Sequence, residues 1–233
     1  MSLPFFYVEG PLPESEIQLD EQNSRHAISV LRMTAGEELQ VTDGKGNLQT
    51  AVIIDPHKKK AVVRVLSSVF TPLPANRVTI GISLLKNVSR LEWFLEKAVE
   101  IGVGNIVLLQ CQRTEKQHIR IDRLQQILIS AMLQSQQVWL TRLLGPVKFD
   151  AHVASAGHDR KYIAHCLDTP KIALRELAAS TGEQLLLIGP EGDFSQEEAD
   201  LAIRHNFIPV KLGETRLRTE TAGMVGATLL CVH

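Results

Sequence analysis

The stretch QLLLIGPEGDFSQEE, residues 184–198, indicates the fold of most of the chain. It begins with a strand-length run that is almost wholly apolar, and a loop with two glycines separates this run from Ser195. Ser195 and Glu198 have the spacing of a capping box, which starts a helix. A strand followed by a short loop and a helix is the repeating unit of a parallel sheet with helices on both faces. The stretch therefore predicts an α/β domain.

The same alternation continues on both sides of this stretch. Ser89 and Glu92 also have capping-box spacing, and Gly102 is placed to end the helix that they start. The predicted strands cover residues 78–85, 106–109, 162–167, 184–188 and 208–212, and the predicted helices cover residues 89–102, 121–138, 195–206 and 221–232.

Residues 1–70 show a different, β-rich pattern. Residues 43–47, Asp-Gly-Lys-Gly-Asn, lie between two strand-like runs and predict a hairpin. Residues 20–33 predict one amphipathic helix with Ala27, Val30 and Leu31 on a shared face. Strands expected at residues 5–8, 39–42, 48–54 and 61–70 complete a small barrel.

A boundary between these two patterns is expected at residues 71–76. Pro72 and Pro74 lie in this segment, and proline interrupts both helices and central strands. We therefore expect a β-barrel domain over residues 1–71 and an α/β domain over residues 72–233.

Composition argues against several classes of protein. The formal net charge of −1 gives no bulk attraction for nucleic acid, so an RNA site must be a local patch. Three widely spaced cysteines, Cys111, Cys166 and Cys231, argue against a secreted disulfide scaffold. The first ten residues lack the pattern of a signal peptide, and no window has the apolar length that spans a bilayer. The eight histidines include no H-x-x-x-H pair. We expect a cytoplasmic protein without a membrane or metal partner.

Two loops follow predicted strands at the edge of the sheet where α/β proteins bind ligands. They are residues 189–194 and residues 213–222, and the second holds two arginines and two glutamates. Glycines in both loops allow the backbone to approach a ligand closely. Taken alone, the first loop is also explained as an ordinary strand-to-helix turn, and the second as a solvated, salt-bridged connection.

The sequence argues against sites for other ligands and against a catalytic nucleophile. Residues 84–89, the turn after the first strand of the α/β domain, contain no glycine, so a dinucleotide fingerprint is absent. The chain also has no Walker motif and no nucleophile elbow. His165 and Cys166 are neighbours on a predicted strand, which favours a core or edge histidine and a small buried cysteine.

Both loops resemble those of the RsmE family, ribosomal RNA uridine-N3 methyltransferases of the SPOUT superfamily. The likeness continues in order along nearly the whole chain. The matching stretches are 25–32 (RHAISVLR), 43–46 (DGKG), 92–103 (EWFLEKAVEIGV), 188–192 (IGPEG) and 212–222 (LGETRLRTETA).

This resemblance implies a PUA-like N-terminal barrel and a parallel α/β sheet tied in a deep trefoil knot. It implies S-adenosylmethionine as cofactor, a homodimer, and methylation of uridine N3 in 16S ribosomal RNA of the small subunit. The cofactor is expected to lie against Leu167, Ile188, Gly189, Pro190, Glu191, Gly192, Leu212, Gly213, Leu217 and Thr221.

The chemistry of uridine N3 points to three side chains. N3 is a weak nucleophile while protonated, so the site must favour proton loss or stabilise the charge that spreads to O2 and O4. Arg218 suits that role because a guanidinium stays charged and donates in a planar fork. Glu191 and Glu220 are the nearest bases in the sequence, although a loop carboxylate is more often a cap or an ion-pair partner. A structural ion pair is also the alternative for Arg218.

RNA contact is assigned to the N-terminal domain, although residues 1–70 carry seven Lys/Arg and nine Asp/Glu. Arg25, Arg32 and Lys45, together with the run HKKK at residues 57–60, form the expected patch. The alternative for the lysine run is a solvated turn. A folded RNA of specific shape is recognised with few charges.

Two features depart from the family pattern. Where members often carry Glu-Gln-Ser-Gly-Arg, this chain has Leu133, Gln136 and Gln137 in place of the glutamate, glycine and arginine. This puts in doubt any RNA or dimer contact of that arginine. Asp193 stands where a second glycine is usual.

Two other functions remain open. One is an RNA-binding protein that keeps the fold without catalysis, and the other is an α/β enzyme for a different small molecule. The intact glycines of both loops argue against the first.

Overall fold

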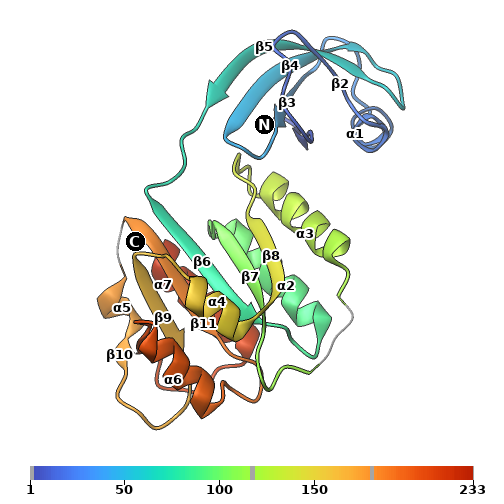
Figure 1. The fold of residues 1–233 in the computed structure, drawn as a ribbon. Coiled ribbons are helices and arrows are strands. Elements are labelled where there is room, and N and C mark those ends of the chain that lie inside the picture. The colour runs from blue at the N-terminus through green and yellow to red at the C-terminus, as the bar shows by residue number, and fades with distance from the viewer. Residues whose placement is uncertain (1–2, 116–118, 179–180, 233) are drawn as a thin grey trace. The chain divides into compact units, whose positions relative to one another are not determined.

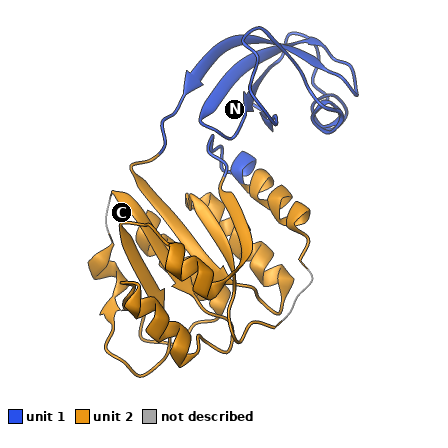
Figure 2. Cartoon of the chain, viewed as in Figure 1, with its two compact units in different colours: residues 1–73, 132–140 blue, residues 74–131, 141–233 orange. Residues whose placement is uncertain are grey.

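The computed structural model describes residues 3–115, 119–178 and 181–232. The chain forms two compact units (Figures 1 and 2), and the first comprises residues 1–73 with residues 132–140. The second comprises residues 74–131 and 141–233. The sequence placed residues 132–140 in the second domain, whereas the structure packs them with the first unit. Hydrogen bonds explain this, because Gly46 donates to the carbonyl of Val138 at 2.9 Å and Leu140 donates to that of Gly44 at 2.9 Å.

The first unit is a curled five-stranded sheet in the order β1-β3-β4-β5-β2 (Figure 1). Its strands are β1 (Phe5–Tyr7), β2 (Glu16–Gln18), β3 (Glu38–Thr42), β4 (Asn47–Asp55) and β5 (Val62–Phe70). The predicted hairpin joins β3 to β4, and the carboxylate of Asp43 accepts hydrogen bonds from the amide of Lys45 at 2.8 Å and the side chain of Asn47 at 2.6 Å. Alternate side chains of β3 and β4 are buried in the core of this unit.

The single helix predicted for residues 20–33 is wrong in detail. Helix α1 spans only Glu21–Arg25, and a π-helical segment, η1, follows over His26–Val30. The wider π turn, with Leu31 donating to the carbonyl of His26, rotates the residues after it away from the core. Ala27 is therefore fully buried, whereas Val30 and Leu31 are exposed.

The second unit is built on a seven-stranded sheet in which every pair of neighbouring strands is parallel. The strand order is β10-β12-β9-β11-β6-β7-β8. The sequence predicted five of these strands and missed β8 and β10. In β8 a glycine and a proline interrupt the apolar pattern, and proline is tolerated because β8 is an edge strand. The strands are β6 (Asn76–Ser83), β7 (Asn105–Gln110), β8 (Arg142–Lys148), β9 (Arg160–Ala164), β10 (Ile172–Ala173), β11 (Gly182–Ile188) and β12 (Ile208–Lys211).

Helices cover both faces of this sheet (Figure 1). Leu185 and Leu187 of β11 join a core with residues of α4 and α6, whereas Leu186 contacts α7. Helix α7 lies very close to the sheet, because a Cβ added at Gly226 would stand 2.2 Å from a methyl carbon of Leu186. The helices are α2 (Val88–Glu100), α3 (Ile121–Gln134), α4 (Phe149–Ser155), α5 (Leu174–Leu177), α6 (Gln196–Arg204) and α7 (Thr219–Cys231). Within the described ranges, no helix is long and apolar enough to cross a membrane.

One of the two predicted capping boxes is confirmed. At the start of α6, the hydroxyl of Ser195 accepts from the amide of Glu198, whose carboxylate accepts from the amide of Ser195. The box predicted at Ser89 is wrong, because α2 begins at Val88 and its cap is Asn87, two residues before Ser89. Glu92 instead accepts a hydrogen bond from Arg123 at 2.9 Å.

Helices α2, α3 and α6 end in the same paired hydrogen-bond motif, which places one residue in the left-handed region. That residue is Gly102 (φ +91°) after α2, Asn206 (φ +64°) after α6 and Gln136 (φ +55°) after α3. Helix α3 therefore ends at Gln134, short of the predicted residue 138. The glycine that the family carries at position 136 fits this backbone better than glutamine.

We expect Gln136→Gly to stabilise the protein. The left-handed conformation costs a residue with a Cβ about 1–2 kcal/mol, and the extra entropy of unfolded glycine offsets part of the gain. The net rise should be about 0.5–1 kcal/mol, seen as a higher midpoint of thermal unfolding. Gly102→Ala is the matched control and should lower the midpoint, since its new Cβ meets no atom within 4 Å and only the backbone is strained. An unchanged or lower midpoint for Gln136→Gly would contradict this account.

Candidate functional site

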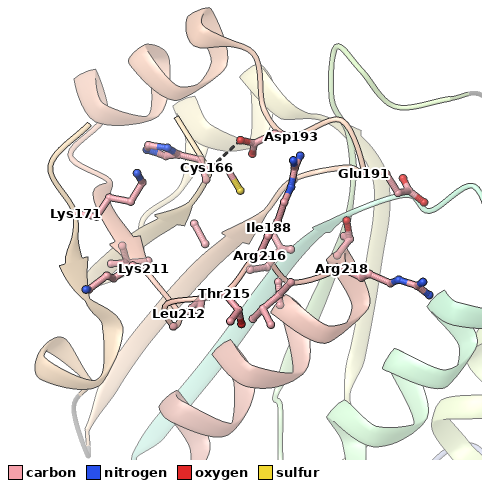
Figure 3. A pocket seen from close by; sticks show the side chains of 18 of the residues that line it. Cys166, Lys171, Ile188, Glu191, Asp193, Lys211, Leu212, Thr215, Arg216 and Arg218 are labelled. Carbon is pink, nitrogen blue, oxygen red and sulfur yellow. Dashed lines mark hydrogen bonds between the residues drawn. The ribbon is translucent and has the colours of Figure 1, made fainter. Parts of the chain in front are cut away.

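A cavity of about 910 Å³ opens at the carboxyl ends of β9, β11 and β12 (Figure 3). These three strands are neighbours in the sheet, so the loops after them converge on one place. The loops after these strands supply most of the wall, which consists of Ala164, His165, Cys166, Thr169, Lys171, residues 188–191, Asp193, residues 210–219, Arg90 and Ala222. The two glycine-bearing loops singled out in the sequence therefore line the same cavity.

Asp193 fixes the shape of the loop between β11 and α6. Its backbone is in the left-handed region, with φ +62°, which explains why a glycine suits this position. Its carboxylate accepts hydrogen bonds from the amide of Cys166 at 2.7 Å and from the amide of Phe194 at 2.9 Å. The first of these bonds, drawn in Figure 3, ties the loop after β9 to the loop after β11. The departure from glycine thus adds a cross-link between two walls of the cavity.

Seven of the residues expected to contact the cofactor line the cavity: Ile188, Gly189, Pro190, Glu191, Leu212, Gly213 and Leu217. Leu167, Gly192 and Thr221 were expected there too but do not line it. The carbonyl of Leu167 accepts a hydrogen bond from Lys171, and that of Gly192 accepts one from Arg113 at 2.7 Å. At the start of α7, the wall is made by Thr219 and Ala222, on either side of Thr221.

The structure separates the three residues expected to act in catalysis. Arg218 and Glu191 are exposed and line the cavity, on the side away from Lys171 (Figure 3). Glu191 accepts a hydrogen bond from the amide of Lys86 at 3.1 Å. Glu220 is buried outside the cavity wall, and its carboxylate lies 3.6 Å from Nε of Arg90.

The ion-pair alternative for Arg218 has no support among the described residues. Glu214 and Glu220, the glutamates closest to Arg218 in the sequence, pair with Lys211 and Arg90 respectively. No salt bridge of Arg218 occurs in the described part of the chain. Its guanidinium is therefore available to a bound molecule.

The sequence missed several polar residues at the end of β9. This strand ends at Ala164, so His165 and Cys166 lie in the loop after it and not on the strand as predicted. Cys166 is exposed and lines the cavity, which corrects the expectation of a buried cysteine. His165 is buried, and burial lowers its pKa below the usual value. Lys171 lowers that pKa further and Asp193 opposes the shift.

Thr169, Lys171 and Arg216 also belong to the cavity wall. Arg216 extends from the loop after β12 toward the loop that carries Asp193 (Figure 3). A cluster of polar residues directly after a strand was the one signal in the sequence that could have indicated this part of the site.

The residues expected to contact RNA lie in the first unit. Arg25, Arg32 and Lys45 are all exposed. Arg32 follows the π-helical segment with φ +60°, and Lys45 lies in the hairpin turn. Lys59 of the lysine run pairs with Glu21 at 3.3 Å, so that run is partly neutralised. Across the described residues, no group of three or more His, Cys, Asp or Glu side chains is placed to hold a metal ion.

Comparisons with known proteins agree with this architecture. Residues 71–231 match the RNA methyltransferase domain family, and residues 19–66 match the RNA methyltransferase PUA domain. The ribosomal RNA small subunit methyltransferase E of Buchnera aphidicola is 28% identical over 98% of this chain and 92% of its own length.

Solved structures give the same result. A probable rRNA methyltransferase from Porphyromonas gingivalis has a TM-score of 0.90 and 34% identity, covering 98% of each chain. The ribosomal RNA small subunit methyltransferase E of Neisseria gonorrhoeae, solved with bound S-adenosylmethionine, has a TM-score of 0.87 and 27% identity, covering 97% of this chain and 96% of that one. The predicted fold class is confirmed in its architecture, a parallel α/β sheet preceded by a PUA-like N-terminal domain. The chain belongs to the RNA methyltransferase family, as its resemblance to the RsmE proteins predicted.

Proposed function

We propose that this protein transfers a methyl group from S-adenosylmethionine to N3 of a uridine in 16S ribosomal RNA of the small subunit. The observation that carries the proposal is the cavity, because the two loops that bear the family motifs converge on it. Relatives of this family with matching chain length are named as small-subunit ribosomal RNA methyltransferases. The function also accounts for a PUA domain on the same chain.

The cavity fits such a cofactor. Its volume of about 910 Å³ is within the range of small-molecule sites. A Cβ added at Gly213 would meet no atom within 4 Å, so the backbone there is open to a ligand. Ile188, Leu212 and Leu217 offer apolar surface for an adenine ring. When bound, S-adenosylmethionine supplies an electrophilic methyl group on a sulfonium, and this chemistry requires no metal.

Arg218 is proposed to stabilise the uridine as N3 loses its proton. Its planar guanidinium presents fixed donors to the negative charge on O2 and O4. Glu191 is proposed as the base that accepts the N3 proton, since it lines the cavity and its carboxylate holds one hydrogen bond, from the amide of Lys86. Glu220 is assigned a positioning role instead, because its partner Arg90 lines the cavity.

The N-terminal unit is proposed to bind the RNA through Arg25, Arg32 and Lys45, which are exposed. We further propose that the protein is cytoplasmic, where ribosomal RNA is available, and that it works as a homodimer. Support for the dimer comes from α7, whose buried face packs within the unit while Met224, Val225 and Leu229 remain only half-buried. A helix that is apolar on several sides needs a second partner.

Gly213→Val should abolish tight cofactor binding and leave the fold intact. The valine side chain meets no protein atom at its Cβ and so takes space in the cavity. Calorimetric affinity for S-adenosylmethionine should fall by at least about tenfold, because a filled pocket cannot accept the ligand. Gly157→Val is the control, since its Cβ is equally open but lies outside the cavity. Equal affinity of both variants and the wild type would remove this loop from the cofactor site.

Arg218→Ala should lower the single-turnover rate of methylation on small-subunit particles by on the order of a hundredfold, because a transition-state donor is lost. Cofactor affinity and melting temperature should change little, since Arg218 is exposed. Arg218→Lys should rescue poorly, because an ammonium lacks the planar fork. A stable alanine variant with the wild-type rate would exclude Arg218 from the mechanism.

Light scattering at micromolar concentration should give twice the mass of the 25.9 kDa chain. Val225→Asp and Leu229→Asp, on the half-buried side of α7, should shift the mass toward the monomer, because a buried unpaired charge disfavours association. Thr228→Asp is the control on an exposed position of the same helix, although it also removes the hydroxyl bond to the carbonyl of Met224. A monomeric wild type would contradict the proposal.

A further inference from the structure

Two aromatic side chains of the first unit form a pair at its surface. Phe70, the last residue of β5, is 60% exposed. Its ring lies edge-on to the ring of Trp139, with 6.2 Å between the centroids and 76° between the planes. Both residues belong to the first unit, although they are far apart in the sequence. Aromatic side chains are enriched on surfaces that bind a partner, so this pair is a candidate contact.

Trp139 is held in place by the hairpin turn and the residue after β5. Its indole N–H donates to the carbonyl of Thr71 at 2.9 Å, and its ring packs so closely that a Cβ added at Gly46 would stand 2.6 Å from a ring carbon. The amide of Thr71 donates in turn to the carbonyl of Gly46 at 2.8 Å. These contacts fix the indole, and the indole supports the ring of Phe70. A platform that is already ordered loses little entropy when a flat group stacks on it.

The charge presented beside this pair is positive. Lys45 and Trp139 form an antiparallel β-bridge, and directly opposed residues of such a bridge project their side chains to the same face. Lys45 is exposed and takes part in no salt bridge between described residues. The carboxylate of Asp43 is buried and accepts hydrogen bonds from the amide of Lys45 and the side chain of Asn47. The surface therefore combines an exposed ring with an unpaired cation.

This combination matches a nucleotide. A base has a flat π face that stacks on an aromatic ring, and its phosphate carries the negative charge that an ammonium attracts. An aliphatic segment of a protein would gain as much from leucine or valine as from phenylalanine, and it would leave the cation without a role. Bases are free to stack in this way where RNA is single-stranded, in loops, bulges and ends.

We propose that Phe70, supported by Trp139, is a stacking site for an unpaired base of the substrate RNA, with Lys45 at the adjacent phosphate. This rests on the proposed function, which supplies the RNA, and it gives Phe70 and Trp139 a role that the family motifs in the sequence did not indicate. The site selects an unpaired nucleotide whatever its identity, because every base has a π face. It acts in binding and takes no part in methyl transfer.

The test measures binding of the full-length protein to unmethylated small-subunit ribosomal particles by filter binding, together with the melting temperature of each variant. Phe70→Leu should weaken binding about tenfold, because leucine keeps an apolar side chain but lacks the π face. Phe70→Tyr keeps the ring and should bind within about twofold of the wild type. Leu66→Ala is the matched control, since Leu66 is 53% exposed on the same strand and is not aromatic. Its affinity should equal that of the wild type.

Two further readouts separate binding from chemistry. Lys45→Gln should reduce the slope of log affinity against log salt concentration by about 0.7–1, the contribution of one phosphate contact. Phe70→Leu should raise the KM for the particles about tenfold and leave the single-turnover rate at saturating particles unchanged, because stacking contributes equally to the ground state and the transition state.

Wild-type affinity of Phe70→Leu would overturn the stacking site, and a loss only in Phe70→Ala would then indicate an apolar contact with a protein. Equal losses in Phe70→Leu and Phe70→Tyr, or a loss matched by a fall in melting temperature, would also overturn it, because Phe70 would then act by packing on Trp139. A wild type that neither binds nor methylates the particles would instead refute the proposed function.

Discussion

The parallel pairing of β11 with β9 on one side and β6 on the other is the constraint on which the second unit depends. β9 in turn pairs with β12, so three carboxyl ends that are far apart in the sequence lie next to one another. Every loop that lines the cavity begins at one of these ends, apart from the contributions of Arg90 and α7. The site is therefore a consequence of strand order, and the side chains in the loops add the chemistry to it.

Close packing of α7 against this sheet imposes a second constraint. Gly223 and Gly226 face Phe94 and Leu186 at distances that leave no room for a Cβ. A larger residue at either position would push the helix off the sheet and move its first turn, where Thr219 and Ala222 form part of the cavity wall. The glycines of α7 thus act on the site through packing, whereas Gly213 is open to the cavity itself.

The polar groups of the cavity differ in how far the protein itself satisfies them. Asp193 and Lys171 are held by backbone groups and stiffen the loops. Among the described residues, both ring nitrogens of His165 and the hydroxyl of Thr169 are buried without a hydrogen-bond partner, and Arg218 is exposed without an ion pair. Of these groups, Arg218 is the one exposed in the cavity wall, and a braced frame around it allows a ligand to bind without reorganising the protein.

The sequence by itself determined the fold class, the hairpin, and most strands and helices of the second unit. It also indicated the two loops that line the cavity. These features depend on local periodicity and on glycine and capping patterns. Tertiary structure decided what those patterns do not encode. The π turn after Arg25 turned Val30 and Leu31 outward, residues 132–140 joined the first unit through backbone hydrogen bonds, and Glu220 turned away from the cavity to pair with Arg90. His165 lines the cavity because β9 ends one residue before it. Each of these outcomes depends on a partner distant in the sequence or on where an element ends. Local residue spacing predicts neither the partner nor the end of the element.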